Sequence, residues 1–431
     1  MAIDIAWSIK IGYVNSPTDF TGRVMGMSIS QPLGFMQPAP QKCTLTLNNY
    51  DGALTPGAGG TYSSVDWMTQ AIFISATVNS TETAQVFHGI VNDFDIRDDG
   101  VRSTVTISCV DWLTIGARAT YVSTVSVDSN APFVARLAAS VSAFATTQGY
   151  LALPLLGNSE SRTQYGTTTP ADTGEVAAGS VTMITKRNVN DALADVLTVR
   201  EMAGVPSVIW PTIIEEATIA GPIVVTEYNH QTVGDTLSRN VDPFTFPFVE
   251  KTPGAGEFPI ESLDRGWHVE RIVNVARITS AWTTNTAVAK DSTKIGGTGV
   301  NQFLVTESSI NNDTDTQRMA DNLVNRFGTP RFEARNIELS TATLADLDST
   351  LKEEVAQLLD VRTGLWNVAT VEYTPTGAST PVTDVSVIFG RRIDARPGRT
   401  TIALELLPAA DYQSFVLDSD VLGVLDQNRL G

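Results

Sequence analysis

Short segments in which apolar and polar residues alternate run through most of this chain of 431 residues. In the segment 42–48, Cys43, Leu45 and Leu47 are separated by polar residues. Because successive side chains of a strand point to opposite faces, this pattern is typical of a sheet with one face in a core and one in solvent. Turn formers separate the segments, as in Asn48-Asn-Tyr-Asp-Gly52. We therefore predict a mainly β protein with α+β insertions.

The order of the expected elements divides the chain into four stretches. Residues 1–120 form the first, with strands expected at 5–13, 42–48, 71–78, 84–94 and 101–109 and a hairpin turn at Asp98-Asp-Gly100. Residues 121–235 are predicted to be a mixed α/β domain, with helices at 131–146 and 190–203 and a long loop at 157–180.

Residues 236–312 are expected to begin as irregular backbone, since Pro243, Pro247, Pro253 and Pro259 fall there, and to continue with strands at 268–278 and 302–307. Residues 313–431 open with a predicted helix at 313–327 that ends before Gly328-Thr-Pro330. The rest of that stretch is expected to be partly helical at 344–359 and to hold strands at 332–339, 367–373, 382–391 and 400–406.

The charge of the chain argues against nucleic-acid binding. The formal net charge is −18, and a surface this acidic repels phosphate. The densest group of basic residues is Arg391-Arg392 with Arg396 and Arg399, diluted by acidic neighbours. The N-terminus lacks the basic start and apolar core of a signal peptide, and no apolar run reaches the ~20 residues that span a bilayer. We expect no membrane anchor.

The two cysteines, Cys43 and Cys109, each lie in a strand-like segment. We predict two buried free thiols, because disulfides are rare in proteins assembled in a reducing cytoplasm. A disulfide between neighbouring strands is the alternative.

Residues 87–109 and 389–406 share one pattern: a strand, Asp and Arg, a turn with Gly, and an alternating strand that starts with Thr. Two unrelated hairpins would share these features. The alternative is a duplicated β-barrel, with one copy near each end of the chain.

Residues with catalytic or metal-binding chemistry are few, and we assign no catalytic, cofactor-binding or metal residues. None of His88, His230 and His268 has a second metal ligand at the usual spacing. No Gly-x-Ser-x-Gly elbow or phosphate-binding loop occurs. Turn and strand-end positions are the simplest explanation for the acidic group Asp93, Asp95, Asp98 and Asp99. The tryptophans beside strands, at 67, 112, 267, 282 and 366, are predicted to be core or interface residues.

The run from Gln41 to Pro56, with Asp51-Gly-Ala-Leu-Thr-Pro56 after a strand, closely resembles a motif of minor tail proteins of phages with long non-contractile tails. The resemblance is to the baseplate-hub, or tail-associated, family and covers about two thirds of the chain. It extends to Val86–Val91, Val105–Leu113, the Ala-x-x-Leu-x-x-Arg-Phe helix before Gly328, Leu339–Leu359 and Leu417–Asp426.

This resemblance implies two related β-barrel domains in each subunit of a homotrimer. Six barrels would then form a ring that adapts the sixfold tail tube to the threefold tail tip and closes the distal channel before DNA ejection. The implied partners are the distal tail ring protein, the C-terminus of the tape-measure protein and further tail-tip or receptor-binding proteins. DNA would pass through the channel without specific binding. The implied location is the tip of the virion tail, after synthesis in the host cytoplasm.

Two other functions remain open. A hexameric distal tail ring subunit would have one barrel and one peripheral domain. A tail protein that binds or degrades glycans would have a cleft lined by exposed tryptophan and paired carboxylates. Many tail-associated proteins carry a C-terminal peptidase or receptor-binding extension, whereas this sequence ends at Gly431, soon after the second expected barrel. We therefore expect no enzymatic activity.

Overall fold

The computed structural model describes most of residues 3–114 and 245–409 and, between these ranges, only short strands. The helices expected at 131–146 and 190–203 and the loop expected at 157–180 lie outside the described residues. Most of the strands belong to one 14-stranded sheet, which confirms the prediction of a mainly β fold. None of the described helices is long and apolar enough to span a membrane.

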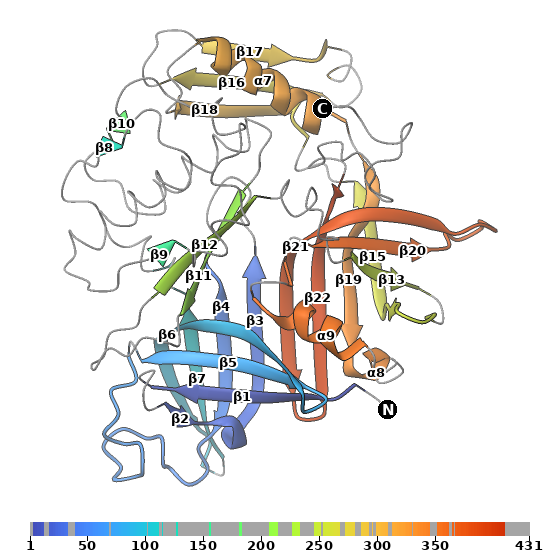
Figure 1. Ribbon diagram of the computed structural model, residues 1–431. Helices are drawn as coiled ribbons and strands as arrows, with labels where there is room; N and C mark the ends of the chain where they lie inside the picture. The colour runs from blue at the N-terminus through green and yellow to red at the C-terminus, as the bar shows by residue number, and fades with distance from the viewer. Residues whose placement is uncertain are drawn as a thin grey trace.

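The N-terminal unit contributes one half of this sheet, in the order β3-β4-β7-β6-β5-β1-β2 (Figure 1). Five of its strands agree with those expected, whereas the strands Thr18–Asp19 and Val24–Pro32 were not predicted, and Gly100 has the positive φ of 82° that the predicted hairpin turn requires. Apart from a 3₁₀ turn at Thr21–Arg23, the elements are β1 Ile5–Ile11, β2 Thr18–Asp19, β3 Val24–Pro32, β4 Lys42–Asn48, β5 Ala71–Val78, β6 Glu82–Asp98 and β7 Ser103–Val110.

The C-terminal unit contributes the other half, and β21 pairs directly with β3 of the N-terminal unit. Its strands are β13 Thr245–Val249, β14 Phe258–Pro259, β15 Ser262–Trp267, β19 Phe332–Ser340, β20 Val368–Tyr373, β21 Val382–Arg396 and β22 Arg399–Pro408. Two short helices, α8 Thr341–Leu344 and α9 Lys352–Leu359, lie between β19 and β20, which confirms the partly helical segment.

A small α/β layer is inserted between β15 and β19. Its sheet has the order β17-β16-β18, with β16 Val275–Ser280, β17 Thr286–Lys290 and β18 Gln302–Ser308. Helix α7 covers Asp313–Phe327, as predicted, and packs Ala320, Leu323 and Phe327 against this sheet. The remaining described strands are β8 Ser126–Val127, β9 Leu155–Leu156, β10 Val181–Thr182, β11 Ser207–Ile213 and β12 Thr226–Thr232.

One expectation for residues 236–312 was wrong. Strand β13 runs through Pro247 and pairs with β20, because Phe246 and Phe248 are fully buried and pack against Phe258. This apolar burial outweighs the backbone donor that proline lacks. Of the strand expected at 268–278, residues 275–278 belong to β16, residues 272–274 are outside any strand, and residues 268–271 lie outside the described part of the chain.

The strands of the two expected β-barrel domains belong to one sheet. The β3–β21 ladder makes the strands of both units one sheet, and the hydrogen-bonded path among the described strands is open. One face of this sheet packs into a common core that contains residues of both units, such as Ile29 of β3 and Ile393 of β21. The four-part division of the chain stays a prediction.

The cysteines generate a first testable prediction. Cys43 and Cys109 lie opposite each other on β4 and β7 as buried free thiols, and burial raises the pKa of both well above the usual thiol range. Because the thiolate is the reactive form, we expect neither residue to react with maleimide in the native protein at pH 7.5 and both to react in denaturant. Mass spectrometry of the labelled protein measures this, and rapid native labelling of either thiol would contradict the burial.

Candidate functional site

The two units have the same strand topology. The order in the sheet is β3-β4-β7-β6-β5 in the first unit and β15-β19-β22-β21-β20 in the second. The matching strands also follow one another in the same order along the chain. In each unit one long strand changes partners midway: β6 pairs first with β5 and then with β7, and β21 pairs first with β20 and then with β22.

The registers of the two long hairpins match as well. An irregularity follows the Val91–Cys109 pair in the first hairpin and the Ile388–Leu406 pair in the second. From there each ladder runs to an equivalent pair before the turn, Asp98–Ser103 and Ala395–Thr400. The repeated hairpin expected from the sequence is therefore present, although the structure matches Phe389 to Asn92 instead of to Phe87.

The junction between the units is the antiparallel ladder of β3 and β21. It extends from the pair Pro32–Gly390 to the pair Met27–Ala395. Next to the Pro32–Gly390 pair, Arg391 lies opposite Gln31, and both side chains are buried. A buried cation is costly unless hydrogen bonds satisfy it, so the surroundings of this guanidinium decide how stable the junction is.

Arg391 obtains its hydrogen bonds from both units. Its Nε donates to Gln31 Oε1 at 2.7 Å, and a terminal nitrogen donates to the same oxygen. The other terminal nitrogen donates to the carbonyl oxygens of Leu358 and Asp360, which lie at the end of α9. Burial lowers the pKa of Arg391 to about 9, while the nearby Asp360 raises it, so the group stays charged at neutral pH.

The network continues from these acceptors into the first unit. Gln31 donates from Nε2 to Gln41 Oε1 at 3.0 Å and to the Val86 carbonyl at 2.7 Å. The Asp360 carboxylate accepts from the backbone N–H of Gln85 at 3.0 Å. Helix α9 thereby rests on the β5–β6 hairpin, where Lys352 pairs with Glu82 at 3.3 Å. These contacts hold the two units in one relative orientation.

The sequence did not reveal this role of Arg391. It placed Arg391 in a diluted basic group, and the structure separates that group: Arg391 is buried, whereas the side chains of Arg392 and Arg399 are 63% and 65% exposed. No short motif marks the position, since its environment comes from α9 and β3, which are far from it in the chain.

The other residues considered from the sequence have structural surroundings. His88 is buried with its ring edge-on to Phe73, as expected for a packed histidine. His230 and His268 have no described side chains. In the acidic group, Asp99 accepts the backbone N–H of Arg102 across the hairpin turn, and Asp93 accepts that of Phe94. The described residues contain no group of three or more side chains suited to a metal ion.

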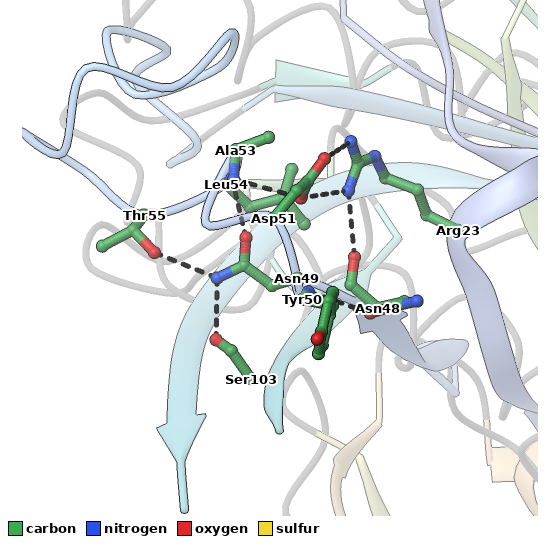
Figure 2. A network of polar contacts seen from close by, with 9 residues as sticks. All are labelled: Arg23, Asn48, Asn49, Tyr50, Asp51, Ala53, Leu54, Thr55 and Ser103. Carbon is green, nitrogen blue, oxygen red and sulfur yellow. Dashed lines mark hydrogen bonds and ion pairs between the residues drawn. The ribbon is translucent and has the colours of Figure 1, made fainter. Parts of the chain in front are cut away.

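The turn after β4, which carries the family-like motif, is fixed by a polar network (Figure 2). The buried Asn49 accepts from the backbone N–H of Leu54 at 2.8 Å and donates to Thr55 Oγ1 and Ser103 Oγ. Arg23 binds both carboxylate oxygens of Asp51, which holds the Asp51 pKa well below its usual range. The network leaves Tyr50 at the tip of the turn, 77% exposed.

Two solved structures superpose on most of this chain. A tail protein from Neisseria meningitidis MC58 superposes with a TM-score of 0.54 at 12% identity, covering 93% of this chain and 96% of that one. The 43 kDa tail protein of prophage MuSo2 from Shewanella oneidensis superposes with a TM-score of 0.52 at 9% identity, covering 94% and 98%. The chain has the fold of these tail proteins. This tail-protein fold extends over nearly the whole of both chains, whereas no family model and no curated sequence matches.

A second prediction concerns the junction. Replacing Arg391 with Ala leaves the buried Gln31 side chain and the two α9 carbonyls without their donor, so we expect a loss of roughly 3 kcal/mol in the free energy of unfolding. The neighbouring Arg392→Ala removes an exposed side chain that pairs with Asp394 at 2.8 Å, and its expected effect is below ~0.5 kcal/mol. Urea unfolding of both variants measures the difference. Equal losses would contradict the role of Arg391.

A third prediction concerns the turn. Asn49→Ala removes one acceptor and two donated bonds at a buried position, so we expect a loss of roughly 2 kcal/mol. Asn48→Ala is the matched control, because Asn48 is exposed and accepts the backbone N–H of Tyr50 from outside the core. Thermal unfolding compares the two, and a control as unstable as Asn49→Ala would show that the network does not depend on Asn49.

Proposed function

We propose that this chain is a structural tail-hub protein of a phage virion that works by assembly and not by catalysis. Three copies would form a ring that adapts the sixfold tail tube to the threefold tail tip and closes the distal channel before DNA ejection. The observation that carries the proposal is the pair of like units held together by Arg391 and its partners. Three such chains present six similar surfaces, as a sixfold partner requires.

The same observation favours the hub over a hexameric distal tail ring subunit. A ring of six chains needs one β unit from each, with a peripheral domain beside it. This chain instead devotes strands near both of its ends to two units with one topology. The tail-protein fold supports either virion role, whereas the repeated unit supports the hub.

The polar face of the joined sheet supports a channel wall. One row of directly opposed residues crosses six neighbouring strands and contains only short polar side chains: Asp93, Ser108, Thr44, Ser28, Asp394 and Thr401. The hydroxyl groups of this row offer DNA phosphates no cationic partner and its carboxylates repel them, although the exposed Arg392 lies on the same face and pairs with Asp394 at 2.8 Å. A surface of this kind, turned toward the channel, would let DNA pass without binding.

The proposed ring would meet the distal tail ring protein on one side and the tape-measure protein and further tail-tip proteins on the other. Large complementary interfaces would do this work. Since the two units match in their ladders, the sixfold partner would contact surfaces that both units share.

The fourth prediction is the mass of the assembly. Light scattering on the purified protein across a concentration series should give a species of three times the 46.2 kDa chain mass. A species of six chains would favour the distal ring, and a single-chain mass at every concentration would contradict the hub.

A further inference from the structure

The row of strands that the two units share ends at β15 on one side and at the second half of β6 on the other. These two strands are the counterparts of β3 and β21, which form the junction. In the second unit β15 occupies the place that β3 has in the first, and in the first unit the second half of β6 occupies the place that β21 has in the second. Within the chain, β3 and β21 pair with each other. Among the described strands, β15 pairs only with β19, and Asp93–Asp98 of β6 pair only with β7. The two edges lie at opposite ends of the row of strands that runs from β6 to β15 (Figure 1).

We propose that β15 of one copy pairs with the Asp93–Asp98 edge of β6 in a second copy, in the antiparallel register that joins β3 to β21 within the chain. This inference rests on the proposed ring and specifies its interface. Each contact joins one edge to the other kind of edge, so it is a head-to-tail contact of the type that closes into rings. Junctions within chains and junctions between chains would alternate around the ring.

The register follows from the matched ladders. Ser28 lies opposite Asp394 in the junction. Arg97 takes the place of Asp394, because each lies six residues beyond the last pair before the irregularity, Val91–Cys109 or Ile388–Leu406.

Asp264 takes the place of Ser28 on the other side. In the first unit Ser108 of β7 pairs with Thr44 of β4, and Thr44 pairs with Ser28 of β3. In the second unit Glu405 of β22, which is equivalent to Ser108, pairs with Asn336 of β19, and Asn336 pairs with Asp264 of β15. Asp264 of one copy therefore lies opposite Arg97 of the next.

The chemistry of the two edges fits this register. Arg97 and Asp264 are both exposed, have opposite charges and would be direct cross-strand neighbours, an arrangement that stabilises antiparallel pairs. Three residues further along, Trp267 would lie opposite Phe94. Trp267 is 52% exposed, with its ring edge-on to Phe332, which is 49% exposed. The edge strand Ser262–Trp267 contains no Pro, and of its two charged residues Asp264 would have an opposite charge across from it.

Engineered disulfides test the register directly. The variant with Arg97→Cys and Asp264→Cys should form disulfides between chains under mild oxidation, giving two-chain and three-chain bands on a non-reducing gel. Directly opposed Cβ atoms lie ~4.5–5.5 Å apart, close enough to bond after a small adjustment. The matched control, Arg97→Cys with Leu263→Cys, moves one cysteine to the opposite face of β15 and should give no such bands.

Charge reversal provides an independent readout. Arg97→Asp should shift the three-chain species toward single chains, and Asp264→Arg in the same chain should restore it. Circular dichroism should show an unchanged fold, since both side chains are exposed. A wild-type protein of three-chain mass whose paired cysteines do not cross-link, or whose assembly ignores Arg97→Asp, would overturn this interface while leaving the ring intact. A wild-type protein that stays a single chain would overturn the ring and the interface together.

Discussion

The structure depends on one buried cation that both β units must satisfy together. A single β ladder such as β3–β21 can twist, so backbone pairing alone would leave the angle between the units variable. Arg391 removes this freedom. Its donors reach Gln31 in the first unit and the carbonyls at the end of α9 in its own unit, and rotation of the units would remove the Gln31 acceptor from a buried charge. The junction is therefore stabilised by electrostatics as well as by hydrogen bonding.

A rigid pair of like units that differ in their connecting segments suits an adaptor. The five matched strands of each unit offer a repeated surface. By contrast, the second unit alone inserts the β16–β18 layer with α7, and it has helices α8 and α9 where the first unit has the turn that carries Tyr50. In the proposed ring, the repeated strands would serve the sixfold neighbour and the unequal insertions the threefold one.

The sequence predicted local elements well and long-range contacts poorly. The alternation in 42–48 and the apolar stripe of 313–327 located β4 and α7 to the residue, because each element buries one face. The strand through Pro247 was missed, since the burial of Phe246 and Phe248 depends on β20 and on Phe258. The role of Arg391 was missed for the same reason: its acceptors belong to distant segments, and no spacing in the sequence brings them together. Similarly, the hairpin repeat was visible in the sequence, but its register came only from the ladders.

The most direct test of the account is electron cryo-microscopy of the purified assembly, or of the tail tip that contains it, reconstructed without imposed symmetry. We predict three copies of this chain around a channel, with six β units at near-equal spacing and two units from each copy. A ring of six copies with one unit each in its wall, or three copies whose second units lie outside the ring, would contradict it.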